Sequence, residues 1–240
     1  MKRISILLAA LLLVFSSCSN FMGKRIRGNG KVTSETRTAS TFSGVKVSGA
    51  IDLYVSNGAS TAIRVYSDEN LMKYIIVEND GDMLKIRPKS GINLKPSRAI
   101  RVYVSAPSFS RLEASGACDI FSENKILSQG TLQLDLSGAS DAKLDLNAPK
   151  VDVDVSGACS VTLKGETRDF TVEGSGSTDI KCYELLAENT KVDISGAGNA
   201  QVFASVKLDV DVSGAADVKY KGNATVSQQV SGAGSVKKTD

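Results

Sequence analysis

The sequence predicts an all-β fold, a parallel β-solenoid in which a Ser-Gly-Ala motif marks one corner of each coil. The motif recurs along most of the chain, and from Ser115 onward its copies are 18 to 22 residues apart. Apolar residues alternate with polar residues on both sides of each copy. Alternation with period 2 is typical of strands with one buried face, and repeats of about 20 residues are typical of solenoids.

Each repeat unit is expected to be a strand, a corner and a second strand. Around Ser156, for example, Val153 and Val155 precede the motif, and Val161 and Leu163 follow it on the same face. One unit cannot bury its apolar face alone, so we expect the units to stack and to pair in parallel. The copies begin at Ser48, Ser115, Ser137, Ser156, Ser195, Ser213 and Ser231, with a degenerate Ser-Gly-Ser at Ser175.

The glycine of the motif is expected to turn the chain. Glycine adopts positive φ angles without a steric penalty, and the small residue after it lets stacked corners approach closely. A glycine-rich phosphate-binding loop is the alternative for any single copy. Repetition at the spacing of a solenoid favours a structural corner.

The N-terminus has the features of an export signal. Lys2 and Arg3 precede an apolar stretch, Ile4 to Phe15, which has the length of a signal peptide and is too short to span a membrane. Small residues then lead to Cys18. We interpret residues 1–17 as a lipoprotein signal peptide and Cys18 as the lipidated residue; an ordinary secretory signal with an incidental cysteine is the alternative.

The lipid anchor would make the membrane a partner of the mature chain. Ser19, rather than Asp, follows Cys18, which favours a bacterial outer-membrane lipoprotein; the periplasmic and surface faces both remain open. Residues 18–30 are expected to form a flexible tether, whose basic residues either attract anionic head groups or are simply solvated. An exported, nearly neutral mature chain excludes nucleic acid as a partner.

The repeat is hidden in the first third of the chain. Ser48 and Ser115 are separated by 67 residues, about three units without a motif. We therefore divide the mature chain into an irregular N-terminal β region, residues 31–110, and regular solenoid coils, residues 111–240. One short helix is expected between Asp68 and Ile76, capped by Asp68 or Asn70.

The sequence resembles the bacterial envelope family named putative autotransporter adhesin, head GIN domain. The resemblance rests on FSGVKVSGAIDLYVSNG, SDENLMKYIIVENDGDMLKIRP, VYVSAPSFSRLEASGACDI and the Ser-Gly-Ala units that follow, together with the lipobox. It covers roughly residues 28–240. It implies a right-handed parallel β-helix and an adhesion role, with no catalytic residues attached to the family.

Composition narrows the chemistry that the chain can perform. The chain contains no histidine, which removes His-assisted nucleophiles, His-ligated zinc and the usual neutral-pH base. Cys118 and Cys159 share a corner position two coils apart, about 10 Å, which is too far for a disulfide. Cys182 occupies an inward position. All three are expected to be small apolar fillers rather than reactive thiols.

An acidic column is the first candidate binding surface. The outward position two residues before the motif serine is acidic in six successive units. Stacked carboxylates could bind Ca²⁺, the one cofactor that the sequence suggests. A solvated, aggregation-resistant face is the alternative. Carboxylate pairs also occur in glycosidases and lyases, but these coils lack the insertions that form their clefts. The column comprises Glu113, Asp135, Asp154, Glu173, Asp193 and Asp211.

Tyr183 and Phe203 are the second candidate, because they occupy the same outward position in adjacent coils. Exposed rings side by side would suit a glycan, although such a pair more often packs on itself. The chain has no tryptophan and only 13 tyrosine and phenylalanine residues.

Three functions are therefore open. The first is a non-enzymatic, lipid-anchored envelope module for adhesion or interaction, whose rigid face contacts a glycan or protein ligand. The second is a carbohydrate-active lyase or hydrolase. The third is a purely structural envelope protein.

Overall fold

The computed structural model describes residues 23–59 and 61–240. The predicted signal peptide and Cys18 lie outside these residues. Within them, no helix has the length and apolar character needed to cross a membrane.

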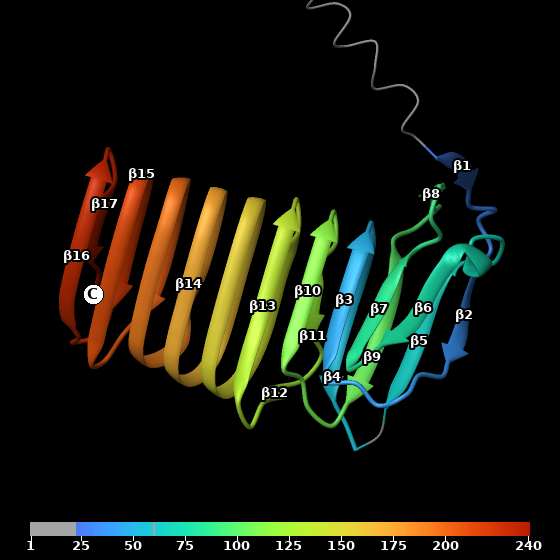
Figure 1. Ribbon diagram of the computed structural model, residues 1–240, viewed down its shortest axis with the longest axis horizontal. Coiled ribbons are helices and arrows are strands. Elements are labelled where there is room, and N and C mark those ends of the chain that lie inside the picture. Colours follow the sequence, from blue (N-terminus) through green and yellow to red (C-terminus); the bar gives the residue numbers. More distant parts are fainter. Residues whose placement is uncertain (1–22, 60) are drawn as a thin grey trace, which may run out of the picture.

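Strands make up most of the described structure (Figure 1). In chain order they are β1 (Lys24–Arg27), β2 (Val32–Arg37), β3 (Gly44–Gly49), β4 (Ile51–Asn57), β5 (Ala62–Asp68), β6 (Ile75–Asp80), β7 (Met83–Pro88), β8 (Ile92–Lys95), β9 (Ile100–Ala106), β10 (Arg111–Gly116), β11 (Ile120–Ser122), β12 (Ile126–Leu127), β13 (Thr131–Gly138), β14 (Asp141–Phe203), β15 (Lys207–Lys221), β16 (Thr225–Gly232) and β17 (Ser235–Lys238). The 3-10 helix η2 (Met72–Tyr74) lies between β5 and β6.

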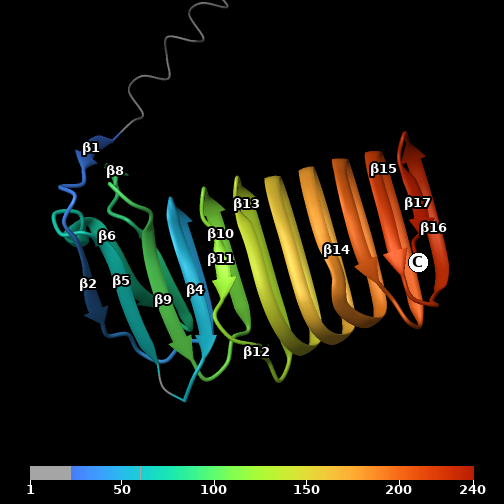
Figure 2. The ribbon, with the colours of Figure 1, turned by 180° about the vertical axis from the view of Figure 1, so that it is seen from behind.

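The Ser-Gly-Ala units stack with their motifs in register. Ser115 of β10 lies opposite Ser137 of β13, and Ser137 lies opposite Ser156 of β14, all in parallel pairs. The same register continues from β14 through β15 to β16. β14 is a single run of extended backbone that winds through several of these units (Figures 1 and 2).

The motif glycines turn the chain, as predicted. Gly157 has a φ of +103°, and a Cβ atom built on it would lie 2.4 Å from the carbonyl oxygen of Gly138 in the unit below. Both the positive φ and the close approach of stacked backbones therefore require glycine here.

The predicted fold class, a right-handed parallel β-helix, is wrong. The main sheet is mixed: β2 pairs antiparallel with β5, β5 with β9, and β6 with β7. The β6–β7 pair is a hairpin whose turn contains Gly81 at a φ of +62°. Chain reversals of this kind cannot occur in a uniform coil. The N-terminal region therefore adds antiparallel strands to the stacked units, and the sheet winds nearly closed around the interior.

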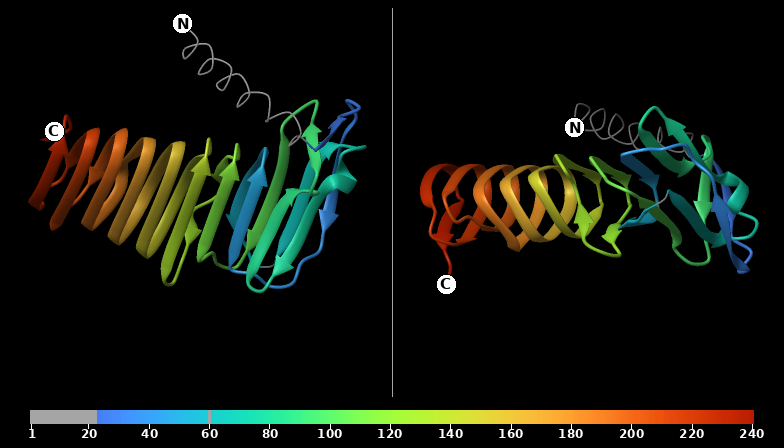
Figure 3. Two further views of the ribbon diagram at one scale, coloured as in Figure 1. Left: turned by 45° about the horizontal axis from the view of Figure 1, so that its top comes forward. Right: turned by 90° about the horizontal axis from the view of Figure 1, so that it is seen from below.

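The sheet encloses one apolar core. Figure 3 shows the strands winding around this interior. The core extends from Phe42 to Val218 and consists mainly of valine, isoleucine, leucine and alanine side chains. Inward and outward side chains alternate along each strand, so the outward positions form columns that cross the strands from unit to unit. These columns create the candidate binding surfaces.

Two expectations for the N-terminal region need correction. Residues 24–27 of the expected tether form β1, which pairs in parallel with β8. The helix between Asp68 and Ile76 is only the three-residue η2, whose N-cap, Leu71, makes no side-chain capping bond. The Asp68 carboxylate instead accepts hydrogen bonds from Gly30 and Ser97.

Candidate functional site: an aromatic ladder beside a polar groove

Four aromatic side chains form a ladder across neighbouring strands of the N-terminal half. The rings of Tyr103 and Tyr54 stack with centroids 4.7 Å apart and planes 15° apart, and Tyr54 and Phe121 stack at 5.1 Å and 29°. Tyr66 meets Tyr103 edge-on at 5.3 Å. We call these four residues the aromatic ladder.

Strand alternation and register position the ladder. Tyr54 lies opposite both Tyr103 and Phe121 in parallel pairs, and each ring follows a buried residue of the core. Cross-strand aromatic pairs of this kind stabilise a sheet. Sequence reasoning missed the ladder, although a signal was present: Tyr54 and Phe121 both lie six residues after a motif serine.

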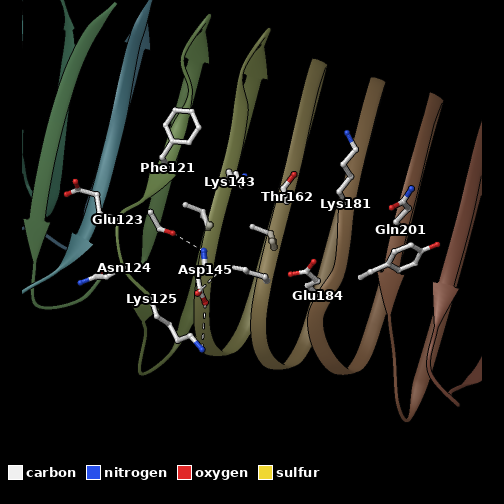
Figure 4. A pocket seen from close by; sticks show the side chains of 15 residues that line it. Phe121, Glu123, Asn124, Lys125, Lys143, Asp145, Thr162, Lys181, Glu184 and Gln201 are labelled. Carbon is white, nitrogen blue, oxygen red and sulfur yellow. Dashed lines mark hydrogen bonds and ion pairs between the residues drawn. The ribbon is translucent and has the colours of Figure 1, made fainter. Parts of the chain in front are cut away.

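The outward-facing column that holds the aromatic ladder continues past Phe121 into a groove of about 610 Å³, which we call the central groove (Figure 4). Phe121 lies opposite Lys143 in the next unit, so it stands where the ladder ends and the polar column begins. Figure 4 shows the Phe121 ring face on at one end of this central groove. The groove is lined by Phe121, Ser122, Glu123, Asn124, Lys125, Lys143, Leu144, Asp145, Thr162, Leu163, Lys164, Lys181, Tyr183, Glu184 and Gln201.

Asp145 organises the floor of the central groove. Its carboxylate lies 3.7 Å from the ammonium group of Lys125 and 3.4 Å from that of Lys164. Its backbone N–H donates a hydrogen bond of 2.8 Å to the Ser122 hydroxyl. These contacts link three successive units and hold polar groups of both charges at the surface.

Two acids, Asp52 and Asp119, lie beside the aromatic ladder. Burial and the neighbouring Asp119 carboxylate raise the pKa of Asp52, while Arg101 acts in the opposite direction. Burial also raises the pKa of Tyr54, so its hydroxyl keeps its proton and can donate a hydrogen bond at neutral pH. The ladder thus presents polar groups along its ring edges.

The predicted acidic column is present as a row. Glu113 lies opposite Asp135, and Asp135 lies opposite Asp154. Arg111 contacts both Glu113 and Asp135 at 2.7 Å, and Lys46 contacts Glu113 at 2.6 Å. Cations of neighbouring side chains therefore offset the charge of the first two members.

The remaining acids continue the column, and none of them forms an ion pair with another residue of the described ranges. A Cβ atom on Gly176 would lie 2.6 Å from the Gly157 carbonyl, which places Glu173 one unit beyond Asp154. Asp193 lies opposite Asp211. Residues 23–59 and 61–240 contain no group of three or more His, Cys, Asp or Glu side chains arranged to hold a metal ion.

Tyr183 and Phe203, the predicted aromatic patch, line different hollows. Tyr183 lines the far end of the central groove, where the Lys221 ammonium group lies 5.4 Å from its ring centroid. Phe203 lines a different hollow of about 690 Å³, together with the half-exposed Leu127 and Leu186. Phe203 therefore offers a control position outside the central groove.

The cysteine prediction is confirmed for the three residues that the structure describes. Cys118, Cys159 and Cys182 are buried and free. Burial raises the pKa of all three thiols, and that of Cys182 reaches about 12. A thiol that keeps its proton is a poor nucleophile, so these cysteines are packing residues.

A family model described as "Putative auto-transporter adhesin, head GIN domain" matches residues 41–224. No curated protein matches the chain. Solved structures show similar folds. A putative adhesin from Bacteroides fragilis is 20% identical with a TM-score of 0.83, covering 89% of this chain and 100% of its own. A putative adhesin from Parabacteroides distasonis is 23% identical with a TM-score of 0.73, covering 90% and 100%.

A third similar structure carries a different description. It is a putative lipid binding protein from Parabacteroides distasonis, 22% identical with a TM-score of 0.68, covering 90% of this chain and all of its own. Because these sequence identities are below 25%, the three structures show a shared fold and nothing about the ligand. The ligand has to be inferred from the residues of this chain.

Proposed function

This chain belongs to the family of putative auto-transporter adhesins with a head GIN domain, and on that premise we propose that it is a non-enzymatic, lipid-anchored module of the bacterial cell envelope that binds a glycan in the central groove. One observation carries the proposal: the aromatic ladder ends in the Phe121 ring at the mouth of a polar groove. An aromatic face packs against the C–H groups of a sugar ring, because the face of the ring carries partial negative charge.

The lining of the groove suits a ligand rich in hydroxyl groups. Its ionisable side chains are nearly balanced, with three carboxylates and four ammonium groups. Sugar hydroxyls can donate hydrogen bonds to the carboxylates and accept hydrogen bonds from the ammonium groups. A polyanion or a polycation, in contrast, would meet side chains of its own charge at several points. A neutral glycan that crosses the strands is therefore the favoured occupant. The carboxylates are Glu123, Asp145 and Glu184, and the ammonium groups belong to Lys125, Lys143, Lys164 and Lys181.

Rigidity favours recognition over catalysis. Most of the groove side chains project from paired strands of one sheet, so they are positioned before the ligand arrives. Only Glu123, Asn124 and Lys125 come from the short connection between β11 and β12. The proposed anchor is the acylated Cys18, with the chain held at the outer membrane. Acylation is tested by growing cells with radiolabelled palmitate: the wild type should be labelled, and a Cys18→Ala variant should not.

Binding is tested with the mature chain from residue 18, carrying Cys18→Ser so that it is not acylated. An array of neutral and acidic glycans and of matrix proteins should show binding to neutral glycans. Phe121→Ala should weaken binding by about tenfold, the effect of losing one aromatic contact. Phe203→Ala, a matched change in the other hollow, should leave affinity unchanged.

Each other result identifies one of the competing functions. Binding of proteins that is independent of Phe121 would replace the glycan with a protein ligand. Shortening of the bound glycan would contradict the non-enzymatic part of the proposal. Absence of any binding, with folded protein, would leave the purely structural role.

A further inference from the structure

The C-terminal end of the sheet is an open edge. β16 and β17 pair with β15, and among the residues that the structure describes neither has a strand on its other side. Figures 1 and 3 show these strands at the end of the molecule farthest from β1 and β2. An open edge presents unpaired backbone N–H and C=O groups and is a template for pairing with another chain.

Of the two edge strands, β17 carries Lys237 and Lys238, whereas β16 lacks the side chains that normally prevent such pairing. Thr225–Gly232 contains no charged residue and no proline. In the adjacent β15 the equivalent outward positions are acidic: Asp209 lies opposite Ser227, and Asp211 lies opposite Gln229. The acids of the repeat are thus replaced by neutral residues in the unit that forms the edge.

The edge strands at the other end of the molecule carry charged side chains, as edge strands usually do. β2 carries Glu35 and Arg37, and β6 carries Glu78 and Asp80. Charged side chains on an edge strand oppose association because they must be desolvated when a second strand pairs with it. This contrast indicates that β16 is the edge strand suited to pairing.

The apolar core also reaches this edge. Leu208 and Val212 of β15 are fully buried, but Val230, which lies opposite Val212, is 39% exposed. Val226, opposite Leu208, is half-buried. The last unit therefore leaves apolar surface next to unpaired backbone, and a further strand would bury both.

We propose that β16 pairs edge to edge with β16 of a second copy of this chain, antiparallel and centred on Gln228. The core-facing residues Val226, Gln228 and Val230 are symmetric about this centre. Pairing there places Val226 of each copy against Val230 of the other, so both cores become continuous. The two Gln228 side chains meet, and amides can donate to and accept from each other.

Self-complementarity identifies the occupant as a second copy. A two-fold interface brings the same surface from both partners, so a charged edge would repel itself and an uncharged one does not. Had Asp211 and Asp209 been repeated in β16, carboxylates would face carboxylates across the axis. A shift of the pairing by one residue would turn the valines away from the core, which fixes the register.

The geometry has a consequence for adhesion, and this part alone rests on the proposed membrane anchor. Pairing through β16 places the two β1 strands at opposite ends of the dimer (Figure 3). With Cys18 acylated in both copies, such a dimer joins two membranes. The edge pairing itself depends neither on the anchor nor on glycan binding.

Sedimentation equilibrium of the Cys18→Ser mature chain tests the pairing. A dimer is expected at micromolar concentration, with β16 amides protected from hydrogen exchange at high but not at low protein concentration. Val230→Lys should raise the dissociation constant at least tenfold, because it puts two ammonium groups at the interface. Val32→Lys, the same change at a 45% exposed position of β2 at the other end of the molecule, should not.

Three results would overturn the proposal. The first is a monomer at all concentrations, the second is an equal effect of both lysine variants, and the third is open-ended association into filaments. Unfolding curves of the two variants, which should match the wild type, exclude loss of fold as the cause. Clustering of vesicles that carry the acylated chain tests the consequence separately: a dimer in solution without clustering would overturn only the joining of two membranes.

Discussion

Asp68 and Ser97 are joined by two hydrogen bonds, one from the Ser97 backbone N–H to Oδ2 (2.8 Å) and one from its hydroxyl to Oδ1 (2.7 Å). The Gly30 N–H donates a third bond, also 2.8 Å, to Oδ1. Asp68 is completely buried, with 0% of its surface exposed. One carboxylate therefore ties together three segments of the N-terminal end that are distant in sequence.

Replacing this carboxylate should destabilise the fold. Asp68→Ala leaves the N–H groups of Gly30 and Ser97, which form part-buried hydrogen bonds, without their acceptor, and this costs about 2 kcal/mol of unfolding free energy. Urea unfolding measures the change. Glu69→Ala is the control, because Glu69 is the exposed neighbour and should cost almost nothing. Equal effects would show that the Asp68 bonds contribute little.

The contribution of Asp68 should also depend on pH. Burial raises its pKa, but the hydrogen bonds from Ser97 and Gly30 act more strongly and hold the pKa below its ordinary value of 3.8. A lowered pKa in the folded state gives stability that is present above pH 4 and is lost as the pH falls further. The stability gap between wild type and Asp68→Asn should therefore be smaller at pH 3 than at pH 7. A constant gap would contradict this account.

The corner glycines should not tolerate a side chain. Gly157→Ala forces a Cβ atom toward the Gly138 carbonyl and holds alanine at a φ of +103°. We expect a loss of at least about 2 kcal/mol, measured by denaturant unfolding. Gly130→Ala is the matched control, since Gly130 has open space around its Cα and no positive φ. It should be neutral or slightly stabilising.

Cys182 should reduce stability only at high pH. Its thiol has a pKa of about 12 in the folded chain, against an ordinary value of 9.0, because it is completely buried. Between these values the unfolded chain loses this proton and the folded chain does not. Stability is therefore complete below pH 9 and falls above it, by up to about 1.4 kcal/mol per pH unit.

The test compares wild type with Cys182→Ala. In each, the unfolding free energy is measured between pH 8 and pH 10, and the two slopes against pH are compared. The variant should be less stable at pH 8, because it leaves a cavity, but its slope should be shallower. Identical slopes would assign the alkaline loss to tyrosines and lysines instead.

Carboxylates of the acidic column that have no cationic partner should repel one another. Asp154→Asn should stabilise the chain by about 0.2–1 kcal/mol, because it removes a like-charge neighbour of Asp135. The gain should shrink in high salt, which screens exposed charges. Asp209→Asn is the control: Asp209 is paired with Lys207 at 2.6 Å, so this change should give no gain. If both variants were stabilised equally, repulsion within the column would not be the cause.

The aromatic ladder shows why the candidate site was largely hidden from the sequence. Tyr54 and Phe121 share a motif position, but Tyr103 belongs to the 67-residue interval in which no motif is visible. Tyr66 reaches the ladder through the antiparallel pair of β5 with β9. Contacts set by strand pairing between distant segments have no periodic signature along the chain.

The mixed sheet was missed for a related reason, although a local signal existed. Asp80 and Gly81 lie between two alternating apolar segments, which is a strong hairpin signal. The hairpin was missed because the parallel pattern of the C-terminal units was expected to continue through these residues. The acidic column, in contrast, was predicted residue by residue, because it lies where the repeat is regular.

The sequence alone determined the strands, the glycine corners, the burial of the cysteines and the positions that face outward, because these depend on local alternation and on backbone conformations that only glycine adopts readily. Only the tertiary structure decided which strands pair, in which direction, and hence where Phe121 meets the central groove and where β16 ends the sheet uncovered. Pairing joins segments far apart in the chain, and it is selected by the packing of the whole core rather than by any single segment.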